Sequence, residues 1–120
     1  MDKSSEELLW AIKNGELNIV KDVVENQNFD VNYEIASRYP LHYAADYGQT
    51  NVLDYLLTKG ANVDAVDKHG ITPILAAIWE GHTACVQLLL DKGATKSGSA
   101  PDGTSYVDAA EKPEIKKLLA

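Results

Sequence analysis

The chain contains 120 residues, of which 45% are hydrophobic and 24% are charged, a composition typical of one globular domain rather than of a disordered chain. Its 18 acidic and 11 basic residues give a formal net charge of −7, which argues against binding to nucleic acid or to an anionic membrane and favours a basic partner. No apolar run approaches the roughly 20 residues that cross a bilayer, the first residues lack a signal-peptide pattern, and there is one cysteine, so we expect a soluble intracellular protein.

The first predicted element is a helix near the N-terminus. Ser4 and Glu7 have the spacing of a capping box at the start of such a helix. Gly15 follows it, where a helix end needs a residue that tolerates positive φ. A second helix is predicted from Val20, Val23 and Val24, because the spacing i, i+3, i+4 places them on one apolar stripe.

The same pattern returns further along the chain with a period of 33 residues, which indicates an internal structural repeat. Residues that recur are Pro40/Pro73, Ala44/Ala77, Gly48/Gly81, Thr50/Thr83, Leu56/Leu89, Leu57/Leu90, Lys59/Lys92, Gly60/Gly93 and Ala61/Ala94. A last, shortened copy closes with Ile115, Leu118 and Leu119. We therefore predict one domain over residues 1–120, with about four repeats of which the first and last are degenerate caps.

An exposed, hairpin-like finger is predicted after each second helix, for example over residues 62–70 and 97–103, which are rich in turn-forming residues. The first finger departs from the pattern. Ser37 stands at the position of Gly70, and residues 26–30 replace the usual Gly-Ala pair. The pattern therefore does not fix the conformation of residues 33–39, and this segment is a candidate for tuning which partner is bound.

These motifs resemble the ankyrin-repeat family, whose pattern includes T-P-L-H-x-A; the chain has PLHYAA at 40–45 and TPIL at 72–75. The resemblance implies an all-α solenoid of stacked helix-turn-helix units with hairpin-like fingers. Beyond the general repeat, the chain resembles a group of small four-repeat members of the family through LLWAIKNGELNIVKDVV at 8–24, DKHGITPILAAIWEGH at 67–82 and PDG at 101–103.

Members of that group bind the heterodimeric actin capping protein and stop it from blocking filament barbed ends. The resemblance thus implies a protein-binding module that promotes filament elongation, a monomer when free, located in the cytoplasm with a nuclear pool left open. The alternative is an ankyrin-type inhibitor of a kinase or a transcription factor.

A candidate protein-binding face follows from the repeat. In the fold that the resemblance implies, the exposed sides of the first helices line a concave surface, and residues 33 apart lie beside one another. This arrangement gathers both tryptophans with tyrosines and acidic residues, which is the composition of a binding hot spot. The candidate residues are Trp10, Lys13, Asn14, Tyr43, Asp46, Tyr47, Trp79 and Glu80. The alternative for Trp10 and Trp79 is that they complete the core.

Residues that could carry chemistry do not form a recognisable catalytic or metal site. His42, His69 and His82 fall at different positions of different repeats, and we expect His42 to be a hydrogen-bonded structural residue. Cys85 precedes an apolar stripe and is interpreted as a small buried residue, and Asp64 and Asp67 as solvated finger charges. We therefore expect no enzyme activity, no cofactor and no metal.

Overall fold

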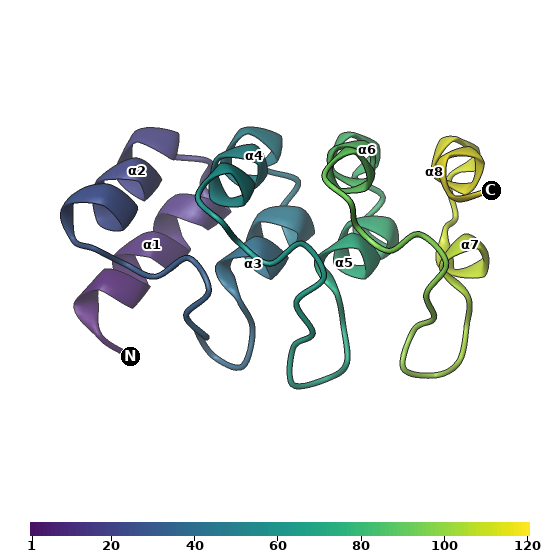
Figure 1. The fold of residues 1–120 in the computed structure, drawn as a ribbon, viewed down its shortest axis with the longest axis horizontal. Helices are drawn as coiled ribbons and strands as arrows, with labels where there is room; N and C mark the ends of the chain where they lie inside the picture. The colour runs from purple at the N-terminus through teal and green to yellow at the C-terminus, as the bar shows by residue number, and fades with distance from the viewer.

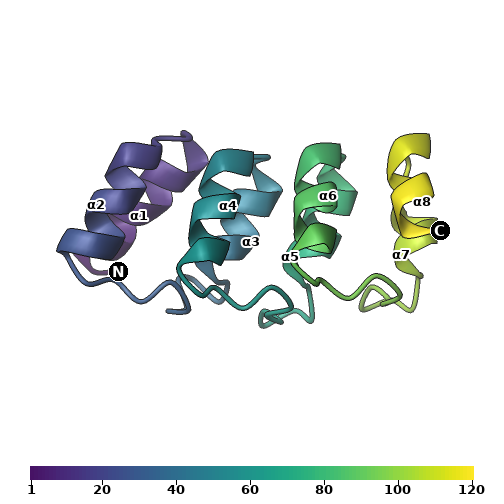
Figure 2. The ribbon, with the colours of Figure 1, turned by 45° about the horizontal axis from the view of Figure 1, so that its top comes forward.

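The computed structural model describes all 120 residues and consists of eight helices in two layers, with long loops extending from one side (Figure 1). The helices form four antiparallel pairs that stack side by side (Figure 2). One layer contains α1 (Lys3–Lys13), α3 (Pro40–Asp46), α5 (Pro73–Glu80) and α7 (Tyr106–Ala109). The other contains α2 (Leu17–Asn26), α4 (Thr50–Thr58), α6 (Thr83–Asp91) and α8 (Pro113–Leu119).

The predicted all-α fold with hairpin-like fingers is confirmed. There is no β-sheet, and the only strand-like pairings are single antiparallel bridges, Ile35 with Arg38 and Ser99 with Ser105, inside two of the fingers. The helix α7 has only four residues, which accounts for the shortened spacing of the last copy. None of the helices combines the length and the apolar character needed to cross a membrane.

The core lies between the two layers and is one continuous cluster of 29 buried residues. The predicted stripes supply it: Val20 and Val23 in α2, and Leu56 and Leu89 at equivalent positions of α4 and α6, are all buried. The i+4 members of the stripes, Val24, Leu57 and Leu90, are partly buried at its edge. Because each helix pair exposes an apolar surface until its neighbour covers it, the pairs stabilise one another.

The start of α1 differs from the prediction. The helix begins after Asp2, whose carboxylate accepts a 2.7 Å hydrogen bond from the backbone N–H of Ser5. The predicted capping box of Ser4 and Glu7 is wrong because Ser4 already lies in the first turn. Ser4 instead donates to Gln27 Oε1 at 2.7 Å, and Gln27 Nε2 donates to Glu7 at 3.0 Å, so these side chains join α1 to the end of α2.

Neighbouring helix pairs are joined at the turns between their two helices. Gly48 has φ +68°, and a Cβ there would lie 2.7 Å from the ring of His82, so both the backbone and the space require glycine. In the second, third and fourth pairs, the residue just before the second helix donates a hydrogen bond from its side chain to a backbone carbonyl of the preceding pair. These bonds join Gln49 Nε2 to Lys13 O at 3.1 Å, His82 Nε2 to Asp46 O at 3.1 Å, and Lys112 Nζ to Gly81 O at 2.7 Å.

The first finger makes a tight turn without a glycine. Ala36 has φ +51° and Ser37 has φ +73°, close to the +80° of Gly70 at the equivalent place in the next finger. Ile35 and Arg38 close the turn with two backbone hydrogen bonds of 2.7 and 3.1 Å. The chain therefore holds a serine in a backbone conformation that costs an L-residue roughly 1–2 kcal/mol.

Replacing Ser37 with glycine is expected to stabilise the protein by up to about 1 kcal/mol. Glycine removes the steric cost of the positive φ, and its greater freedom in the unfolded chain offsets part of the gain. Urea unfolding measures the change. The matched control is Ser99→Gly in the third finger, where φ is not positive and a loss is expected. Equal losses for both variants would show that Ser37 is not strained.

His42 is a structural residue, as predicted. Its side chain is fully buried at the start of α3. Nδ1 accepts a 3.2 Å bond from the backbone N–H of Tyr39, so the ring proton must be on Nε2, which donates to the carbonyl of Ile71 at 2.7 Å. The ring thereby joins α3 to the second finger.

We expect the protein to lose stability in mild acid through His42. Burial lowers the pKa of His42 below its ordinary value of 6.5. As the pH falls, the imidazole of His42 is therefore protonated in the unfolded chain before it is protonated in the folded chain. The contribution of neutral His42 to the free energy of unfolding is complete above about pH 6.5 and decreases as the pH drops below that value. Urea midpoints measured from pH 8 to pH 5 test this. His42→Gln should reduce the slope, whereas His69→Gln, at an exposed site, should not.

Candidate functional site: a face formed by α1, α3 and α5

The predicted binding residues lie at one end of three neighbouring helices of the same layer. Most come from the last turn of a helix or the residue that follows it, and Tyr43 lies in the middle of its helix. The sets are Trp10, Lys13 and Asn14 at α1, Tyr43, Asp46 and Tyr47 at α3, and Trp79 and Glu80 at α5. Because α1, α3 and α5 stack in order, these helix ends follow one another along the molecule (Figure 1). We call these eight residues the aromatic face.

Three aromatic side chains of this face are accessible. Trp10 is 54% exposed, Trp79 is 48% exposed and Tyr47 is 44% exposed. The two tryptophans therefore do not complete the core, because about half of each residue remains in contact with solvent. Large apolar side chains that stay half exposed beside polar groups are typical of protein-binding surfaces.

Tyr43 differs from these three because it is only 7% exposed. Its hydroxyl donates a 2.8 Å hydrogen bond to the carbonyl of Ile35, and burial raises its pKa. The ammonium of Lys13 lies 6.0 Å from the Tyr43 ring centre and 5.7 Å from that of Tyr47. Lys13 therefore contacts the aromatic rings of the next repeat, and Tyr43 forms the floor of the face.

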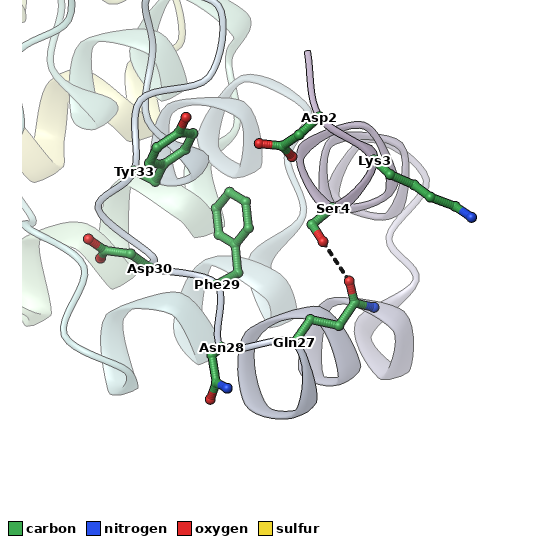
Figure 3. A pocket seen from close by; sticks show the side chains of 8 residues that line it. All are labelled: Asp2, Lys3, Ser4, Gln27, Asn28, Phe29, Asp30 and Tyr33. Carbon is green, nitrogen blue, oxygen red and sulfur yellow. Dashed lines mark hydrogen bonds between the residues drawn. The ribbon is translucent and has the colours of Figure 1, made fainter.

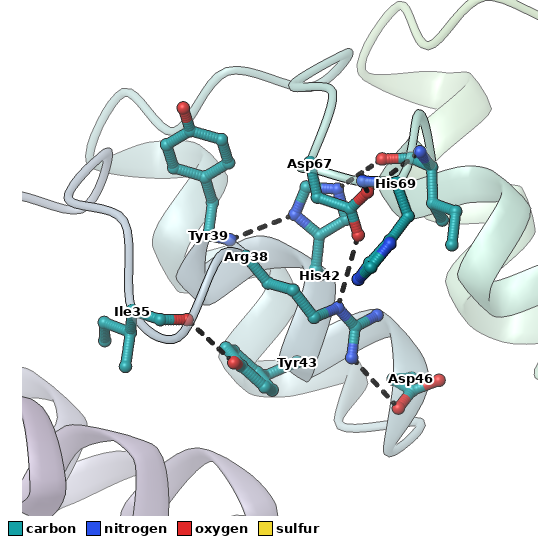
Figure 4. A network of polar contacts seen from close by, with 9 residues as sticks. Ile35, Arg38, Tyr39, His42, Tyr43, Asp46, Asp67 and His69 are labelled. Atoms are coloured by element: carbon teal, nitrogen blue, oxygen red, sulfur yellow. Dashed lines mark hydrogen bonds and ion pairs between the residues drawn. The ribbon is translucent and has the colours of Figure 1, made fainter.

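Arg38 is a residue of this region that the sequence analysis missed. It is the only arginine of the chain, and in Figure 4 it extends from the first finger across α3. Its guanidinium carbon lies 5.0 Å from the Tyr43 ring centre, and its nitrogens lie 3.4 Å from Asp46 and 3.5 Å from Asp67. Arg38 thus holds both Tyr43 and Asp46 of the aromatic face in place. The only feature of the sequence that could have drawn attention to it is that it is the single arginine.

Asp67 corrects a further prediction. Its side chain is completely buried instead of being a solvated finger charge, because it accepts hydrogen bonds from the backbone N–H groups of His69 and Ile71 and pairs with Arg38 (Figure 4). The Arg38 contact is the only one made by its second carboxylate oxygen. Asp64 is exposed to solvent in part and binds the backbone and hydroxyl of Thr95 in the next finger.

The polar members of the face have different roles. Asn14 donates from its side chain to the carbonyl of Trp10 at 2.8 Å and so caps the end of α1. The side chain of Asp46 is 31% exposed and is held by Arg38. Glu80 is exposed and takes part in none of the ion pairs of the structure, so its charge is available to a partner.

The remaining residues with reactive side chains are placed as structural groups. Cys85 is buried, as predicted, with its sulfur 3.5 Å from the hydroxyl of Thr50, and burial raises the pKa of its thiol. A raised thiol pKa lowers reactivity. No three His, Cys, Asp or Glu side chains are grouped where they could hold a metal ion.

Comparison with known proteins shows where these features recur. A family model described as ankyrin repeats (3 copies) matches residues 8–99. Myotrophin of Xenopus tropicalis is 52% identical over 114 residues, a match that covers 94% of this chain and 96% of that protein. The 26S proteasome non-ATPase regulatory subunit 10 of Dictyostelium discoideum is 40% identical over 74% of this chain and 39% of its own length. Mouse synphilin-1 is 31% identical over 85% of this chain but only 11% of its own length.

Proposed function

Since the chain belongs to the ankyrin-repeat family and is a homologue of myotrophin, we propose that it binds the actin capping protein heterodimer through the aromatic face. It is a binding module rather than an enzyme, and in this proposal it inhibits barbed-end capping. The proposed complex leaves more barbed ends free to elongate. Such a role places the protein in the cytoplasm, where it is a monomer until it meets its partner.

The observation that carries the proposal is the exposure of Trp10, Tyr47 and Trp79 along three successive helix ends. Burial of half-exposed aromatic side chains supplies most of the binding free energy at many protein interfaces. Two of the three, Trp10 and Trp79, lie in the segments 8–24 and 67–82 that carry the resemblance to the small four-repeat group.

The charge of the protein supports a basic partner. The chain carries a net charge of −7, and Glu80 stands exposed beside Trp79. An acidic surface of this kind attracts a basic partner surface and raises the rate of encounter.

Calorimetric titration with purified capping protein tests the proposal. We expect saturable binding by the wild-type chain. If no binding occurs at micromolar concentrations, and affinity capture from cell extract recovers a kinase or a transcription factor instead, the proposed partner is wrong.

Salt is expected to act mainly on the association rate of this complex. Charge complementarity accelerates encounter, whereas desolvated aromatic contacts determine how slowly the complex dissociates. In stopped-flow experiments from low to high ionic strength, the association rate constant should fall while the dissociation rate constant changes little. An association rate that does not respond to salt would contradict electrostatic steering.

A further inference from the structure

A second aromatic and acidic site lies at the other end of the molecule's first repeat, away from the aromatic face. A cavity of about 420 Å³ opens between the N-terminus of α1 and the first finger. Asp2, at its edge, comes just before α1, whereas Trp10 lies in the last turn of that helix, about 12 Å further along at 1.5 Å per residue. The cavity shares no residue with the aromatic face.

Two aromatic rings form one wall of this cavity. Phe29 and Tyr33 make an edge-to-face pair with ring centres 5.5 Å apart and an angle of 81° between the rings. Phe29 packs against the core, and this fixes the pair, while Tyr33 is 50% exposed. Tyr33 and Asp2 also line a second hollow of about 290 Å³, so the two hollows share these side chains.

Carboxylates lie beside these rings. In Figure 3, the Asp2 carboxylate points toward the space beside Phe29 and Tyr33, whereas Asp30 lies at the rim with its carboxylate directed away from Phe29. Asp2 uses one oxygen to cap α1 and keeps the second for a ligand, while Asp30, which accepts from the backbone of Asn32, adds negative charge at the rim. The backbone hydrogen bond from Ser5 lowers the pKa of Asp2, so this carboxylate stays charged at neutral pH.

The rest of the lining is polar and carries one positive charge. Lys3 is the only basic side chain that lines the cavity, and in Figure 3 its ammonium extends away from the two rings. Ser4 and Gln27, which bond to each other across the cavity wall, make that wall polar. A ligand that matches this site carries a positive charge and a flat surface that can lie against a ring.

From this geometry we propose that the cavity between the N-terminus of α1 and the first finger binds an arginine side chain of a protein partner. A guanidinium group can stack on an aromatic ring and at the same time direct planar N–H groups at a carboxylate, which an ammonium group cannot do equally well. The hollow is open to solvent, and its volume of about 420 Å³ has room for an arginine side chain.

A titration followed by amide NMR spectra tests this site with the full chain. The probe is the blocked tripeptide acetyl-Gly-Arg-Gly-amide, and the matched control replaces arginine with citrulline, which has nearly the same shape without the charge. We expect saturable shifts at millimolar peptide confined to residues 1–5 and 27–35, and none with citrulline. Equal binding of both peptides, no saturable shift, or shifts centred on the aromatic face would overturn the proposal.

Two variants that are expected to keep the fold show whether the arginine peptide binds at this cavity. Asp2→Asn retains a good helix cap while removing the charge, and Tyr33→Ala removes the exposed ring. Each should weaken binding of the arginine peptide by about threefold to tenfold. Tyr47→Ala, which removes an exposed ring of the aromatic face, is the control and should leave binding of the arginine peptide unchanged. Because no capping protein is present, the result is independent of the proposed function.

Discussion

Replacing Leu89 with alanine is expected to lower the free energy of unfolding by about 2–5 kcal/mol, because the side chain is fully buried between the helix layers and its removal leaves a cavity. Leu56→Ala, at the equivalent place in α4, should have a similar effect. Urea unfolding measures both changes. The neighbouring Leu90 is only partly buried, so Leu90→Ala is the matched control and should cost less.

Unfolding of the wild-type chain should also be one cooperative transition. The core is a single cluster, and the pairs are joined by the bonds of Gln49, His82 and Lys112 to the preceding pair. Tryptophan fluorescence and far-ultraviolet circular dichroism should therefore give the same midpoint. Losses below about 0.5 kcal/mol for both Leu56→Ala and Leu89→Ala would mean that the stripe is assigned wrongly.

Trp79→Ala is expected to weaken binding to capping protein by about 2–4 kcal/mol, the largest loss of any single residue of the aromatic face. The ring is half exposed in the free protein, so a partner can bury it, and the exposed Glu80 beside it suits a basic partner. Trp10 should come next. We also expect Tyr43→Ala to reduce stability, because Tyr43 is buried and bonded to Ile35.

The decisive comparison measures Trp79→Ala both by calorimetric binding and by urea unfolding. Stability should change less than affinity does. Val66→Ala is the control: this side chain is 57% exposed but lies in the second finger, so its loss should alter neither quantity by more than about 0.5 kcal/mol. If Trp79→Ala lowers stability by several kcal/mol while the folded fraction keeps its affinity, Trp79 belongs to the core.

The regular parts of the fold could be predicted from the sequence because each depends on local spacing. The 33-residue period placed Leu56 and Leu89 at equivalent core positions, and Gly48 and Gly81 at turns where φ is positive. Such features recur from copy to copy, and each copy supports the interpretation of the next.

Features that depend on contacts between different repeats could not be predicted in this way. Asp67 resembles a solvent-exposed finger charge in the sequence, and its burial results from Arg38, 29 positions earlier, reaching across α3. Tyr43 was predicted to lie on the exposed side of its helix, yet the finger closes over it and leaves Trp10, Tyr47 and Trp79 as the exposed rings of the aromatic face. Spacing indicates which residues are neighbours but not which side chain covers another.

Elongation of actin from capped filament seeds measures directly whether the protein inhibits barbed-end capping. Barbed ends are blocked with purified capping protein that has been incubated with the wild-type chain or with Trp79→Ala, and elongation is followed by pyrene fluorescence. We expect the wild-type chain to restore elongation in proportion to its concentration and Trp79→Ala to restore much less. Elongation that stays blocked at saturating wild-type protein, or that both chains restore equally, would contradict this expectation.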